Sequence, residues 1–125
     1  MPDVTTRPRG EYPQAEPMHH IDLDEQADVL LGELPGHGRR TQSIARESGV
    51  SLIMMAMEGG DSVQEHAARG ATTVQVLRGH TTLSSGGRSV DLRPGELVFF
   101  QPGVRHDIRA EEQSVVLLTV TGGDQ

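Results

Sequence analysis

The chain has 125 residues and no cysteine, which fits one domain and excludes disulfide bonds and thiolate metal sites. It is acidic, with 18 Asp and Glu residues against 11 Lys and Arg, and only 2% of its residues are aromatic. Nucleic-acid binders need a basic surface on which bases can stack, so the composition predicts no nucleic-acid partner.

The first 17 residues, MPDVTTRPRGEYPQAEP, are polar and rich in proline. This composition predicts a mobile arm, which we assign to residues 1–20. The segment has no apolar signal core, and no apolar run in the chain approaches the roughly 20 residues that span a bilayer. We therefore expect a cytoplasmic protein without a membrane partner.

Residues 21–34, IDLDEQADVLLGEL, predict one helix. Asp22 or Asp24 is placed to cap its start, acidic residues occupy its first turn, and Pro35-Gly36 ends it. The alternative is a strand at residues 21–23 followed by a single helical turn.

After Gly38 the sequence changes to short apolar runs and period-two alternation, which predicts an all-β domain. The breaks between the runs carry Gly, Pro and Ser, and Ser85-Gly86-Gly87-Arg88 predicts a tight hairpin. Short strands at this regular spacing favour a sandwich or barrel. Strands are expected near residues 41–47, 50–57, 73–78, 80–84, 88–92, 97–101, 105–109 and 114–120.

Three runs are apolar without alternation, at residues 52–57, 97–100 and 115–118. A strand with one face in water should alternate, so these strands are expected to be covered on both faces. One face would line the barrel interior. The other needs a cover, either the N-terminal helix or a second subunit, and we predict a homodimer.

Two Gly-to-His segments stand out in the β region. The first is GDSVQEHAA, which begins at Gly60 and contains His66, and the second is GELVFFQPGVRH, which ends at His106. These segments resemble the two motifs of the cupin superfamily, and both frames match without a gap. The similarity is to small single-domain bacterial cupins of the RmlC-like superfamily. It implies a double-stranded β-helix, or jelly-roll barrel, over about residues 39–120, within a single domain of residues 21–125.

The resemblance also implies four metal-ligand positions, of which His66 and His106 fill two. Ala68 and Thr72 stand where cupins carry the second His and the Glu. Zinc and iron sites normally use at least three protein ligands, so one divalent ion (Zn, Fe, Ni or Mn) would need a further donor. His80 is the first candidate for it. Other donors near the motifs are Gln64, Glu65 and Gln75.

On this fold we expect a mostly apolar pocket with two convergent imidazoles, which is typical of a small-molecule site. His66 and His106 should lie on the inner face, close enough to share one ligand atom. The function predicted is a non-enzymatic binding, sensory or accessory protein for a small organic molecule. The alternative is a metal-dependent oxygenase, isomerase or cyclase. The pocket residues expected are His66, His106, Val74, Val76, Leu97, Phe99 and Ile108.

Overall fold

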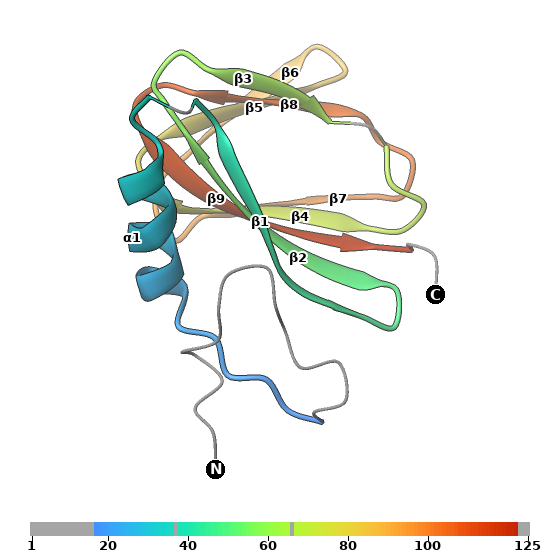
Figure 1. The fold of residues 1–125 in the computed structure, drawn as a ribbon. Helices are drawn as coiled ribbons and strands as arrows, with labels where there is room; N and C mark the ends of the chain where they lie inside the picture. Colours follow the sequence, from blue (N-terminus) through green and yellow to red (C-terminus); the bar gives the residue numbers. More distant parts are fainter. Residues whose placement is uncertain (1–16, 37, 66, 123–125) are drawn as a thin grey trace.

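The computed structural model describes residues 17–36, 38–65 and 67–122 (Figure 1). Most of the arm predicted at residues 1–20 lies outside these ranges. Within them no helix is long and apolar enough to cross a membrane. The elements in chain order are α1 (Leu23–Glu33), β1 (Arg40–Glu47), β2 (Val50–Met57), β3 (Ser62–Glu65), β4 (Thr72–Arg78), β5 (Thr81–Ser85), β6 (Arg88–Leu92), β7 (Leu97–Phe100), β8 (His106–Ala110) and β9 (Ser114–Thr121).

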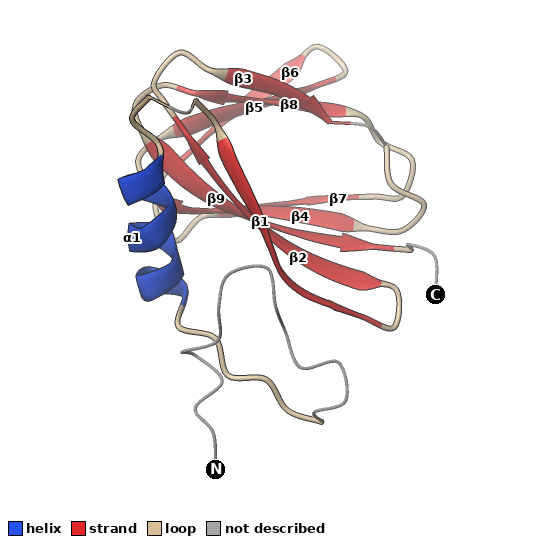
Figure 2. Cartoon of the chain, in the orientation of Figure 1, coloured by secondary structure: helices blue, strands red, loops and turns tan. Residues whose placement is uncertain are grey.

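The strands form two antiparallel sheets that face each other (Figure 2). One sheet has the order β1-β2-β9-β4-β7 and the other the order β3-β8-β5-β6. Neighbours in each sheet are mostly distant in sequence, as a jelly roll requires. The all-β class and the jelly-roll barrel predicted from the sequence are therefore confirmed.

The barrel interior is an aliphatic core between the two sheets. Alternate residues of β2, β4 and β9 point into it, and β5, β6 and β8 supply the opposite wall. Each strand thus contributes every second residue to one common core. The fully or nearly fully buried members include Met55, Met57, Val74, Val76, Leu83, Leu92, Ile108, Ala110, Val116 and Leu118.

Helix α1 covers the outer face of the five-stranded sheet. Its Leu30 is 1% exposed and packs in a second cluster with Met54 and Ala56 of β2 and Val115 of β9. The apolar runs in β2 and β9 therefore lack alternation because the barrel covers one face and the helix the other. This confirms the prediction of two covered faces for residues 52–57 and 115–118 and identifies the helix as the cover. The prediction is wrong for residues 97–100, where one face of the strand is exposed.

The start of α1 is fixed by a cap and an ion-pair cluster. Oδ1 of Asp22 accepts a hydrogen bond from the Glu25 amide at 3.1 Å, so Asp22 is the N-cap and the alternative strand at residues 21–23 is wrong. Asp24 instead pairs with Arg78 of β4, which also binds Asp28 at 3.0 Å. Hydrogen bonds to Asp28 and Asp24 raise the pKa of Arg78. These exposed pairs orient the helix but contribute little stability.

The homodimer stays a prediction, and the exposed apolar side chains of β7 now support it. With β2 and β9 covered by α1, the large apolar side chains left exposed on the outer face of this sheet's edge strand are Leu97 and Phe99, at 51% and 59%. A second copy seated there would remove them from water. Light scattering at micromolar concentration should give the dimer mass. A monomer mass alone would contradict the prediction.

Candidate functional site

His106 is a buried histidine at the start of β8. Its ring is 4% exposed and stacks on Phe100, with ring centroids 4.2 Å apart and ring planes 7° apart. Neither ring nitrogen has a hydrogen-bond partner within the part of the chain that the structure describes. A buried polar group without a partner costs about 1–3 kcal/mol, so both nitrogens are open to a hydrogen bond from a water molecule or a ligand.

The ring of His106 borders a cavity of about 370 Å³ between the two sheets. This volume lies at the small end of the range for small-molecule pockets. Most of the wall is aliphatic, and no Asp or Glu belongs to it among the described residues. The lining residues are Arg39, Thr41, Ile53, Met55, Val63, Ala68, Thr72, His106, Leu118 and Val120.

Three of the four ligand positions implied by the resemblance lie at this cavity. Ala68 and Thr72, which stand at ligand positions in the resemblance, line it together with His106. His66 lies outside the described residues, so its predicted pairing with His106 stays a prediction. In the backbone ladder Glu65, the last residue of β3, lies opposite His106.

The described donors do not fit a divalent cation. They contain no group of three His, Asp or Glu side chains that could hold a metal. At the cavity they offer one imidazole, the hydroxyls of Thr41 and Thr72, and the cationic guanidinium of Arg39. A second imidazole from His66 would still leave the set one ligand short of the usual three.

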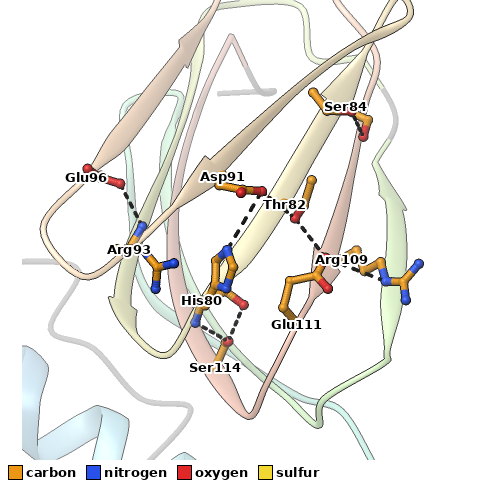
Figure 3. Close-up of polar contacts among 10 residues, drawn as sticks. His80, Thr82, Ser84, Asp91, Arg93, Glu96, Arg109, Glu111 and Ser114 are labelled. Carbon is orange, nitrogen blue, oxygen red and sulfur yellow. Dashed lines mark hydrogen bonds and ion pairs between the residues drawn. The ribbon is translucent and has the colours of Figure 1, made fainter.

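His80 cannot complete a site with His106, which corrects the prediction of a third ligand. Its carbonyl accepts a hydrogen bond from the Glu111 amide, five residues and about 16 Å along the chain from His106. Neighbouring Thr81 is fully buried, so His80 points to the outer face, where Nε2 lies 3.8 Å from Oδ1 of Asp91 (Figure 3). The two ladders of β5, which begin at the next residue, Thr81, show no register shift.

The outer cluster around His80 is a surface network. The Thr82 hydroxyl lies 2.9 Å from Oδ1 of Asp91 and 2.8 Å from Oε2 of Glu111, and Arg109 pairs with Glu111 (Figure 3). Gln64 is also exposed, opposite Asp107. These groups lie outside the barrel, away from the cavity.

Of the expected pocket residues that the structure describes, only His106 lines this cavity, and the inward orientation expected of Leu97 and Phe99 is wrong. Leu97 and Phe99 are exposed on the outer face, because β7 turns Val98 and Phe100 inward instead. Val74, Val76 and Ile108 do lie inside the barrel, fully buried, but they pack in the core and do not line the cavity. The cavity is displaced toward the end of the barrel at which β8 begins.

The sequence analysis did not identify Arg39, the residue before β1, or Thr41 in β1, both of which line the cavity. Neither belongs to a Gly-to-His segment, and no local spacing relates them to His106. Alternation along β1 carries the only signal, since it places Arg39 and Thr41 on one face.

Two facing antiparallel sheets with this strand order define the class of double-sheet jelly-roll proteins, to which cupins belong. The family model for the cupin domain matches residues 53–121, more than half of the chain. The chain belongs to the cupin family. No curated protein matches its sequence significantly.

Solved structures show the same fold at low identity. A cupin superfamily protein from Desulfitobacterium hafniense is 18% identical, with a TM-score of 0.71 over 94% of this chain and 100% of that one. The cupin domain of an XRE family transcriptional regulator from Enterobacter cloacae is 12% identical, with a TM-score of 0.63 over 70% and 100%. KdgF from a Halomonas species is 17% identical, with a TM-score of 0.60 over 70% and 83%.

Proposed function

We propose that this cupin binds a small organic molecule in the cavity between its two sheets and that it does so without a metal and without catalysis. The observation that carries the proposal is His106, a 4% exposed imidazole on the cavity wall with both nitrogens unpaired among the described residues. A neutral imidazole offers one donor and one acceptor, which suits the polar end of a ligand. The aliphatic wall suits an apolar body.

Methyl NMR spectra recorded with a set of small aromatic and branched alkyl acids, amides and alcohols test the proposal. Binding compounds should shift the methyl signals of Ile53, Leu118 and Val120 at the cavity. Signals of Val76 and Leu92, which lie in the core away from the cavity, should move least.

Two histidine variants locate the interaction. His106→Ala should weaken binding about 10-fold, because the ligand loses a hydrogen-bond partner and packing surface. Its stability should change by less than about 2 kcal/mol, since lost packing and the removal of two unpaired polar atoms oppose each other. His80→Ala, on the outer face, is the matched control and should bind as the natural protein does.

The binding data and the metal content together distinguish a metal-free binding protein from a metal-dependent enzyme. No shift at the cavity, or equal losses in the two histidine variants, would contradict the proposal. One equivalent of Zn, Fe, Ni or Mn in untagged protein, lost in His106→Ala, would instead support the metal-dependent alternative. The metal content of the natural protein and of His106→Ala should therefore be measured on the same samples.

A further inference from the structure

The polar part of the cavity wall is biased toward hydrogen-bond donors and positive charge. Its ionisable side chains among the described residues are Arg39 and His106, and its other polar side chains are Thr41 and Thr72. The whole chain carries a net charge of −7, yet no described carboxylate belongs to this wall. Across the remainder of the wall the side chains are aliphatic.

Arg39 lines the cavity with a 40% exposed side chain, and only one of its three guanidinium nitrogens contacts another residue among those described. Its Nη1 lies 3.4 Å from each carboxylate oxygen of Asp61 and 3.3 Å from the carbonyl of Ser62, which are long contacts made by one nitrogen. Within the described part of the chain, Nη2 and Nε have no protein partner. These two nitrogens form the side-on fork that binds a carboxylate through two parallel hydrogen bonds.

His106 adds a fixed donor from the opposite sheet. The stack on Phe100 fixes the plane of the imidazole ring, so the directions of its two nitrogens are fixed as well. Arg39 precedes β1 of one sheet, and His106 begins β8 of the other. A ligand held by both would therefore bridge the two sheets at the mouth of the barrel.

We infer that the ligand is a small carboxylic acid, with its carboxylate on Arg39 and His106 and its apolar body against Ile53, Leu118 and Val120. The inference rests on the proposed function, since it names the chemical class of the molecule which that cavity binds. A single guanidinium and a single imidazole suit a monoanion. A phosphate dianion carries twice that charge, and it would bring no apolar body to the aliphatic part of the wall.

Matched ligands test the inference directly. 3-Phenylpropanoate, 3-phenylpropanamide and 3-phenylpropan-1-ol share one hydrocarbon body and differ at the polar end, and inorganic phosphate is an anion without that body. Titration calorimetry on the full chain should give about 10-fold to 100-fold tighter binding of the acid than of the amide or alcohol, the range of a charge-assisted hydrogen bond. Phosphate should not bind.

Arginine variants assign the selectivity. Arg39→Met should reduce the acid-to-amide ratio to about 2-fold or less, while Arg39→Lys, which keeps the charge but loses the fork, should fall between. Arg40→Met is the matched control, because Arg40 pairs with Glu33 and does not line the cavity, so its ratio should stay unchanged. Circular dichroism confirms that each variant is folded.

The outcomes separate the two proposals. Amide and alcohol binding as tightly as the acid would overturn the carboxylate inference and leave the binding function standing. An acid preference that survives Arg39→Met would also overturn it. If no acid, amide or alcohol shifts the methyl signals at the cavity, both the inference and the proposed function fail.

Discussion

Replacing Gly79 by alanine should lower the free energy of unfolding by more than about 3 kcal/mol. Gly79 has a φ of +85°, a conformation that costs an L side chain about 1–2 kcal/mol. A Cβ there would also collide with the Gln113 carbonyl oxygen and lie 2.8 Å from Cα of Ser114. Both neighbours are backbone, so relief would require the link between β8 and β9 to move. Urea unfolding followed by circular dichroism measures the loss.

Gly95→Ala separates the collision from the backbone strain. Gly95 has a φ of +91°, almost that of Gly79, but no heavy atom lies within 4 Å of its would-be Cβ. We expect this variant to lose only the conformational part, about 1–2 kcal/mol. Equal losses at the two glycines would show that the close approach of Gly79 to the β9 segment does not matter.

Leu30→Ala should cost about 2–5 kcal/mol, because it opens a cavity in the cluster that joins α1 to β2 and β9. Leu30 is 1% exposed, and its contacts are what hold the helix over the sheet. The midpoint of urea unfolding should fall accordingly. The variant should also bind a fluorescent hydrophobic dye more readily, since a loosened helix exposes the outer face of the sheet.

Val29→Ala is the control on the adjacent residue of the same helix. Val29 is 41% exposed, and a surface substitution of this kind is usually within about 0.5 kcal/mol of neutral. Alanine also has the higher helix propensity. If Leu30→Ala were as mild as Val29→Ala, the docking of α1 would contribute little to the stability of this domain.

The sequence could predict those features that local chemistry determines. Gly86 and Gly87, at φ of +58° and +80°, form the predicted turn, and Ser85 pairs with Arg88 as a tight hairpin requires. The helix was predicted within two residues at its start because a capping Asp precedes its apolar positions. Strand β3 was not predicted, because its sequence, Ser-Val-Gln-Glu, has one apolar residue and shows no alternation of apolar and polar residues.

The candidate site was harder to predict because it depends on phase and on contacts across the barrel. All four residues of β7 are apolar, so alternation could not decide between Phe99 and Phe100, and only the pairing of Val98 with Val74 fixes the phase. His80 was the first candidate for a third metal ligand, but it takes the outward position that strand alternation favours beside the buried Thr81. Arg39 lies at the cavity because of how β1 packs in the barrel, and neither Gly-to-His segment includes it.

The stack of His106 on Phe100 makes the proton NMR signals of His106 a probe of the cavity. The chain has no tryptophan and a single tyrosine, so its intrinsic fluorescence is weak. An imidazole held 4.2 Å from a phenyl ring sits in the shielding cone of its ring current. We therefore expect the carbon-bound protons of His106 to resonate upfield of their usual positions, and a molecule that enters the cavity should shift them.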